Sequence, residues 1–198
     1  MPNLERSVGA LILHKTYSGD SDVYLELLSA ELGRIGAVSR GAKHLKSRLR
    51  YALEPYSVIQ AVILPTRAGG WQLINAELSS NLFYDYKNTQ RQVLIRLFEL
   101  LRRVLPSNEP STMIKDLVEL IIGNTEVVIE RYLYLATFVL SSLGYLDLEV
   151  VLELPEFTNM KTAKTIKNFI YNSPTTLSDD SLLQLKKIIQ QALKNSQL

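Results

Sequence analysis

Hydrophobic and polar residues alternate in short runs through the first eighty positions of the chain, a pattern typical of half-buried β-strands. In one of these runs, Val23, Leu25 and Leu27 occupy every second position. Turn-forming residues, such as those at 18–21, separate the runs. The pattern predicts five strands, over Ser7–Lys15, Asp22–Ser29, Arg34–Arg40, Pro55–Leu64 and Trp71–Leu78.

From Phe83 onward the hydrophobic residues fall at the three- and four-residue spacing of helices. The segment 126–143 is apolar on most sides, so we expect it at the centre of a helical bundle. Ser178 stands where it can cap the last helix. The pattern predicts one helix that ends at Leu105 and others over Thr112–Ile122, Glu126–Leu143, Thr162–Tyr171 and Asp179–Leu193.

Short strands followed by helices predict an α+β protein, with a small β-barrel over residues 1–80 and an all-α region over residues 81–198. A five-stranded barrel of the OB type is the favoured architecture, and such barrels bind nucleic acids across one face and its loops. An SH3-like barrel fits the number of strands nearly as well. The expected fold is an N-terminal OB-fold nucleic-acid-binding domain followed by a C-terminal helical bundle domain.

A run of basic residues between Gly33 and Arg50 adds a functional clue. It holds six of the 22 Lys and Arg residues and no acidic residue, although the net charge of the whole chain is only +2. Like charges at this density repel one another unless an anion lies alongside, and a phosphate backbone is the commonest such anion. On charge alone, a solvated basic loop that binds nothing explains the run equally well.

Composition narrows the remaining chemistry. The chain has no cysteine, which excludes disulfides, thiol catalysis and zinc sites built on cysteine. No segment approaches the roughly 20 apolar residues of a membrane span, and the N-terminus lacks the basic start and long apolar core of a signal peptide. We therefore expect a cytoplasmic protein with no membrane partner.

Motifs for enzymatic chemistry are weak. Gly36 and Gly41 have the separation of the glycines in a phosphate-binding loop, but Ala42 stands at the position of the required lysine. Asp20 and Asp22 could hold a divalent metal for a nuclease or nucleotidyl transferase, although turn formation explains them better. Neither histidine has a carboxylate partner at metal-ligand spacing. The sequence predicts no enzyme, no cofactor and no metal site.

Four further residues keep two interpretations each. For Gly36 we favour a β-bulge over a close approach to a ligand, and for Gly41 a turn and such an approach both stay open. Tyr51 and Tyr56 could stack on nucleic-acid bases, with packing in the core or on the surface as the favoured role.

Several short motifs, taken in their order along the chain, resemble a known family. They are Gly19-Asp20, Glu31-Leu32-Gly33-Arg34, Arg40-Gly41-Ala42-Lys43, Lys46-Ser47-Arg48-Leu49, Leu53 with Pro55, and Asn75-Ala76-Glu77-Leu78. The combination resembles the RecO family of bacterial recombination mediators. The resemblance is dense over the first eighty residues and looser beyond them, where Leu143-Gly144-Tyr145 is similar to part of the family's second half.

The RecO resemblance implies an OB barrel, a helical domain and a non-enzymatic role in RecF-pathway DNA repair at the bacterial nucleoid. It implies binding of single- and double-stranded DNA, annealing of complementary strands, and loading of RecA onto DNA coated by single-stranded-DNA-binding protein (SSB). The implied partners are RecR and the acidic tail of SSB. Some family members hold zinc through cysteines after the Leu-Gly-Tyr segment, and this chain has none. An adapter that binds RNA or the ribosome through the same barrel is the alternative function.

The residue chemistry and the resemblance agree on the basic run as the DNA contact. The predicted contacts are Arg34, Arg40, Lys43, His44, Lys46, Arg48 and Arg50, with Lys15 and Arg67 as additions on neighbouring strands or loops. About five phosphate contacts predict a log–log salt slope of roughly −3 to −4 on single strands. The candidates for the SSB tail are Arg96, Arg102, Arg103 and Arg131. Taken singly, each of these four is better explained as an exposed helix charge.

Overall fold

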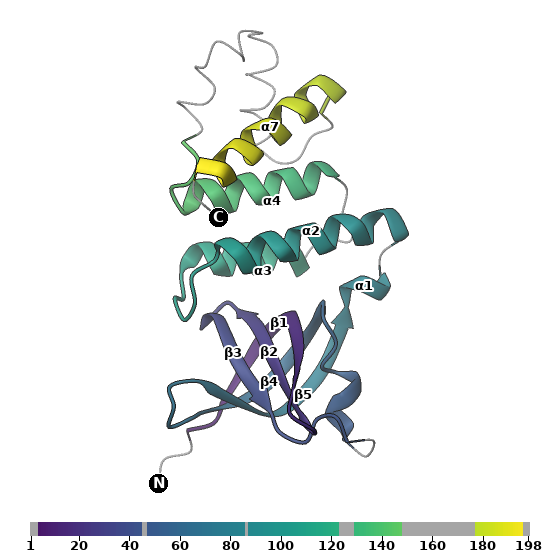
Figure 1. Cartoon of the computed structure of the whole chain (residues 1–198), viewed down its shortest axis with the longest axis vertical. Coiled ribbons are helices and arrows are strands. Elements are labelled where there is room, and N and C mark those ends of the chain that lie inside the picture. Colours follow the sequence, from purple (N-terminus) through teal and green to yellow (C-terminus); the bar gives the residue numbers. More distant parts are fainter. Residues whose placement is uncertain (1–3, 45–46, 86, 123–128, 148–176, 196–198) are drawn as a thin grey trace. The chain divides into compact units, whose positions relative to one another are not determined.

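The structure of the protein is a computed structural model that describes residues 4–44, 47–85, 87–122, 129–147 and 177–195 (Figure 1). Its elements are β1 (Arg6–Ser18), β2 (Asp22–Ser29), β3 (Gly33–Ser39), η1 (Arg48–Tyr51), β4 (Ser57–Pro65), β5 (Trp71–Asn81), α1 (Leu82–Asp85), α2 (Asn88–Val104), α3 (Thr112–Ile122), α4 (Ile129–Ser142) and α7 (Asp179–Asn195). Among the described residues, one compact unit contains the strands with η1, α1 and α3, and a second contains α2, α4 and α7. The helix predicted over Thr162–Tyr171 lies outside the described residues.

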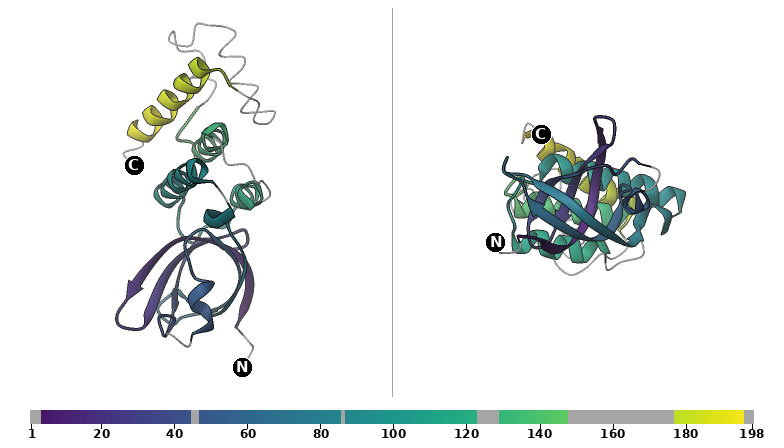
Figure 2. Two further views of the ribbon diagram at one scale, coloured as in Figure 1. Left: turned by 90° about the vertical axis from the view of Figure 1, so that its right-hand side faces the viewer. Right: turned by 90° about the horizontal axis from the view of Figure 1, so that it is seen from below.

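The strands close into a barrel in the order β1-β2-β3-β5-β4. β1 pairs with both β2 and β4, and β3 runs parallel to β5, whereas the other neighbouring strands are antiparallel. This connectivity is that of an OB barrel, which confirms the predicted OB fold and sets aside the SH3-like alternative. Figures 1 and 2 show the strands wrapping around a common interior.

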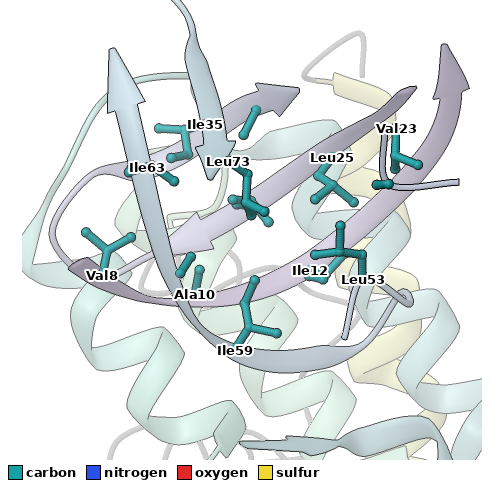
Figure 3. Close-up of a cluster of buried hydrophobic side chains, with 14 residues drawn as sticks. Val8, Ala10, Ile12, Val23, Leu25, Ile35, Leu53, Ile59, Ile63 and Leu73 are labelled. Atoms are coloured by element: carbon teal, nitrogen blue, oxygen red, sulfur yellow. The ribbon is translucent and has the colours of Figure 1, made fainter. Parts of the chain in front are cut away.

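Alternate residues of the strands fill the barrel interior (Figure 3). In β2 the predicted inward-facing residues Val23, Leu25 and Leu27 are all buried, and Ile35 and Ala37 of β3 join them in the same cluster. Burial of one large aliphatic side chain stabilises a fold by about 1.5–3 kcal/mol. The packed interior therefore stabilises the barrel that carries the loops.

The strand boundaries differ from the prediction at the hairpin between β1 and β2. The sequence pattern places Ser18 in the turn, but Ser18 pairs with Asp22 as the last residue of β1. The remaining turn is short and contains Gly19 at a φ of 58°, a conformation that glycine adopts without steric cost. β1 is therefore longer than predicted and reaches past the hydrophobic core.

The predicted β-bulge at Gly36 is wrong. β2 and β3 pair without a register shift over the whole length of β3. Gly36 instead lies against Tyr24, because a Cβ atom at Gly36 would meet the Tyr24 hydroxyl and ring. The missing side chain gives the tyrosine ring a place against the sheet.

A segment that follows the barrel in sequence belongs to the same compact unit. α3 packs against β2, and before it the Asn108 N–H donates to Arg34 O at 2.8 Å. Arg34 Nη2 also donates to Ser107 Oγ at 2.8 Å. Gly33 permits this approach, because its φ is 74° and a Cβ atom there would lie 2.7 Å from the carbonyl carbon of Glu109. The domain boundary between residues 80 and 81 stays a prediction, and the barrel unit includes this later segment.

The second unit is helical, and α4 packs against both α2 and α7. Among the described helices of this unit, the arrangement confirms the central position predicted for the apolar segment 126–143 over its described part, Ile129–Ser142. The buried Thr137 hydroxyl donates to Leu133 O at 2.7 Å, which satisfies it inside the unit. Ser178 caps α7 as predicted, since the Ser181 N–H donates to Ser178 Oγ at 3.4 Å. In the described part of the chain, no helix has the length and apolar character needed to cross a membrane.

Candidate nucleic-acid interface

An irregularity in β1 decides which side chains line one end of the barrel. The pairing of β1 with β2 shifts its register between Ile12 and His14. Directly opposite residues of paired strands share one face, so Lys15 and Tyr17, which lie opposite inward-facing residues of β2, are on the inner side. β-Bulges at barrel rims re-aim side chains in this way. Without the shift, His14 would take an inner position in place of Lys15.

Lys15 and Tyr17 contribute to an open pocket of about 480 Å³ at this end of the barrel, which we call the rim pocket. Its other lining residues come from β2 and from the connection between β3 and β4. The complete lining is Lys15, Tyr17, Val23, Ala42, Lys43, Arg50 and Glu54. Val23 and Ala42 are buried core residues, so the exposed part of the lining presents cations, one carboxylate and one aromatic ring.

Lys15 is neutralised by a carboxylate of the same pocket. Its Nζ lies 2.8 Å from Glu54 Oε1. The Lys15 side chain is only 9% exposed, whereas that of Glu54 is 44% exposed. A lysine buried to this extent needs a partner, because an unpaired buried charge is costly. Lys15, a predicted additional DNA contact, is thus held by the protein itself.

Lys43 lies over the Tyr17 ring. Its Nζ is 4.8 Å from the ring centroid and donates to Gly19 O at 2.6 Å. Lys15 Nζ lies 5.5 Å from the same centroid. Cations within about 6 Å of an aromatic ring are attracted by its π-electrons. The two lysines therefore restrain Tyr17, which is 65% exposed.

A carboxylate fixes the loop that carries Lys43. Asp22 Oδ1 accepts hydrogen bonds from the Gly41 N–H at 2.9 Å and from the Ser21 hydroxyl at 3.0 Å. These bonds, in that order, and the charges of Arg40 and Lys43 hold the pKa of Asp22 below its ordinary value of 3.8. Gly41 itself has a φ of 65°, which shows that it forms a turn. A close approach of Gly41 to a ligand stays a prediction.

The hypothesis of a metal-dependent nuclease finds no support at Asp20 and Asp22. The Asp22 carboxylate is engaged by the turn, as the sequence favoured. Within the residues that the structure describes, no group of three or more His, Asp or Glu side chains could hold a metal ion.

The predicted DNA contacts of the basic run lie mostly on the connection between β3 and β4. Its exposed members are Arg40, His44 and Arg50. Lys43 is partly exposed, and Arg67 is exposed in the turn between β4 and β5. Lys46 lies outside the described residues, as does the side chain of Arg48. The structure brings Lys43 and Arg50 together at the rim pocket, and DNA binding by the whole set stays a prediction.

Arg34 lies apart from these residues. It is near the start of β3, whereas Arg40 follows its end, and six residues of extended strand span about 20 Å. Its guanidinium donates to Ser107 Oγ and lies 3.9 Å from Glu26 Oε2. The structure therefore gives Arg34 contacts within the barrel unit and does not place it beside the rim pocket.

No sequence motif marks Tyr17, the aromatic residue of the pocket. The register shift in β1 turns the side chains of Lys15 and Tyr17 inward, and it leaves no trace in the hydrophobic pattern of the sequence. The only local signal for Tyr17 is the basic residue Lys15, two positions earlier. Tyr51 is 77% exposed on η1. Tyr56 stacks on Phe83 with ring centroids 5.4 Å apart, which supports its packing role.

The arginines predicted for the SSB tail lie in the second unit, in different surroundings. The interpretation of Arg131 as an exposed helix charge is wrong, because Arg131 is buried in α4, which packs against α2 and α7. Arg96 is exposed on α2, as expected. Arg102 and Arg103 stand in the last turn of α2, where positive charge interacts favourably with the helix dipole. Helix stabilisation gives these two residues a structural role, and contact with the SSB tail stays a prediction.

Comparison with known proteins finds similarity over the barrel. Residues 4–81 match the sequence model of the family described as "Recombination protein O N terminal". The barrel of this chain is thus similar to the N-terminal domain of the RecO family. A curated RecO relative, "DNA repair protein RecO" of Myxococcus xanthus (strain DK1622), is 30% identical over 112 residues. The alignment covers 56% of this chain and 46% of the relative, so the chain spans about half the length of the relative that it matches.

Proposed function

We propose that this chain is a DNA-binding recombination mediator that acts in DNA repair. The observation that carries this proposal is the match of the whole barrel to the RecO N-terminal family. The basic connection between β3 and β4 supports it, because Arg40, Lys43 and Arg50 offer the positive charge that a phosphate backbone attracts. Single and double strands carry the same phosphates, so both forms of DNA bind.

Annealing of complementary strands follows from this charge without a catalytic group. Two DNA strands repel each other through their phosphates, and a basic surface that contacts both lowers the repulsion. Base pairing then supplies the free energy of annealing. The protein, together with RecR, thereby helps to load RecA onto SSB-coated DNA and has no enzymatic activity of its own.

The contact with the SSB tail belongs to the helical unit in this proposal. Arg102 and Arg103 stand together in the last turn of α2, and Arg103 is exposed. An acidic peptide tail pairs with such arginines through charge-assisted hydrogen bonds.

An annealing assay tests the proposal. Two complementary labelled oligonucleotides coated with SSB are mixed with wild-type protein or with the variant Arg40→Ala/Lys43→Ala/Arg50→Ala, without nucleotide. The wild type should accelerate annealing. The variant should lose most of this acceleration, and its log–log salt slope for single strands should be shallower by about 2, from ~0.7 per phosphate contact.

A charge-matched control distinguishes the loss of these three site residues from a mere decrease in the total positive charge. Lys186→Ala/Lys187→Ala/Lys194→Ala removes three exposed cations from α7 and should leave annealing and the salt slope unchanged. A wild type that binds nucleic acid but does not anneal strands would contradict the mediator role. Preferential binding of RNA would then point to an adapter of another process.

A further inference from the structure

We propose that the rim pocket binds one unpaired nucleotide, with its base stacked on Tyr17 and its phosphate held by Lys43 and Arg50. This assignment rests on the proposed function and sharpens it. Charge attracts single and double strands alike. The rim pocket, in this proposal, adds a contact that only unpaired DNA makes, so that one end of the barrel distinguishes a single strand from a duplex.

The size of the rim pocket fits a single nucleotide. Its volume of about 480 Å³ lies within the roughly 300–1,000 Å³ typical of small-ligand sites. The bases of a duplex are paired and stacked, so one of them can enter such a pocket only after it has been extruded from the helix. An unpaired base enters without that cost, and the pocket therefore favours single strands.

Tyr17 is placed as a stacking platform. Its backbone is fixed by pairing with Val23 of β2, and its ring is restrained by Lys43 at 4.8 Å and Lys15 at 5.5 Å. The residue nevertheless stays 65% exposed. Bases stack on aromatic side chains of OB barrels irrespective of sequence, because every base has a π-face. A restrained and exposed ring loses little conformational freedom when a base binds.

The charges around the ring suit a phosphate. Glu54 balances Lys15 at 2.8 Å, which leaves the positive charges of Lys43 and Arg50 uncompensated within the lining. Arg50 is exposed, and a guanidinium can donate two parallel hydrogen bonds to a phosphate. A base on Tyr17 therefore brings its phosphate into a region of net positive charge.

Two substitutions separate stacking from a merely structural role of Tyr17. Tyr17→Phe keeps the aromatic ring and removes only the hydroxyl. Tyr17→Leu keeps a shorter apolar side chain and removes the π-face. Tyr84→Leu is the matched control, because Tyr84 is 72% exposed on α1 and does not line the pocket.

The experiment uses the full chain with two probes, a short single strand that contains one 2-aminopurine and the duplex of the same sequence. Wild type should quench 2-aminopurine fluorescence in the single strand. Tyr17→Leu should remove this quenching, weaken single-strand binding about tenfold and change duplex binding by less than about twofold. Tyr17→Phe and Tyr84→Leu should behave as the wild type. Thermal unfolding establishes that each variant is folded.

Several outcomes overturn the proposal. Equal losses on the single strand and the duplex, or no loss on either, contradict a nucleotide in the rim pocket, while normal annealing by the wild type leaves the proposed function intact. If wild-type protein binds no DNA, both proposals fail. If Tyr17→Leu does not fold, the fluorescence of the single strand with wild-type protein tests the proposal. Absence of quenching there excludes a base stacked on Tyr17.

Discussion

Basic residues stand at both ends of β3 in different surroundings. Near its start, Arg34 donates to Ser107 Oγ at 2.8 Å and lies 3.9 Å from Glu26 Oε2. Just past its end, Arg40 is exposed, and the connection that follows carries Lys43 and Arg50 to the rim pocket. At the first end the arginine contacts a hydroxyl and a carboxylate of the protein. At the second end Lys43 donates to a backbone carbonyl beside the open aromatic pocket, and Arg40 and Arg50 are exposed.

The difference shows how a strand divides charge that is contiguous in sequence. Six residues of extended chain separate Arg34 from Arg40 by about 20 Å, more than the Debye length of roughly 8 Å at physiological salt. The two ends therefore contribute almost independently to the surface potential. A structural cation therefore differs from a candidate phosphate contact in the partners that the fold gives it. The density of charge along the chain does not distinguish the two.

The largest expected effect comes from blocking the backbone approach at the Arg34 end. Gly33→Ala introduces a Cβ atom at a φ of 74°, 2.7 Å from the carbonyl carbon of Glu109. We expect the free energy of unfolding to fall by about 3 kcal/mol, from left-handed strain of ~1–2 kcal/mol and displacement of the packed segment. Urea unfolding measures this loss.

Gly19→Ala is the control for the conformational part of that loss. Gly19 has a φ of 58°, but no atom lies within 4 Å of a Cβ atom built there. Its replacement should cost only the strain of about 1–2 kcal/mol. A loss in Gly33→Ala no greater than this would contradict the close approach of residues 107–110 to β3.

Lys15 provides a second, smaller test, because it lies at the open end but is paired as Arg34 is. Glu54→Ala leaves the 9% exposed Lys15 side chain without its carboxylate, so the free energy of unfolding should fall by about 1–3 kcal/mol. Lys15→Met/Glu54→Gln removes both charges and should recover most of the loss. Urea unfolding at fixed salt compares the variants. If the free energy of unfolding of Glu54→Ala equals that of the wild type, Lys15 does not need this carboxylate and behaves like the exposed cations.

The barrel could be predicted well because alternation reports directly which side of a strand is buried. Val23, Leu25 and Leu27 are buried as their spacing predicts, and so are Ile35 and Ala37. The pairing of β1 with β4 and the parallel pairing of β3 with β5 join distant parts of the chain. Such contacts leave no local pattern, so the OB connectivity followed from the number of strands and the family resemblance.

The candidate site could be predicted only in part. Charge marks Lys43 and Arg50, but Tyr17 enters the pocket through a register shift in β1. Lys15 finds its partner 39 residues later, and Arg34 finds Ser107 73 residues later. The local sequence shows that a residue is charged, but the fold determines which carboxylate or hydroxyl lies beside it. The distinction between structural and exposed cations therefore required the structure.

The smallest expected effect concerns the carboxylate that positions Lys43. The Gly41 N–H and the Ser21 hydroxyl, more than the nearby cations, hold the pKa of Asp22 below 3.8. A pKa lowered on folding adds stability above the unfolded-state value of about 4, and this stability is lost as the pH falls through the folded-state pKa. Asp22→Asn should therefore lower the melting temperature slightly at neutral pH and make its decline below about pH 4 shallower, as thermal unfolding across pH would show. Asp20→Asn makes the same change of charge two residues away, and an equal flattening in both variants would contradict the role of the Asp22 hydrogen bonds.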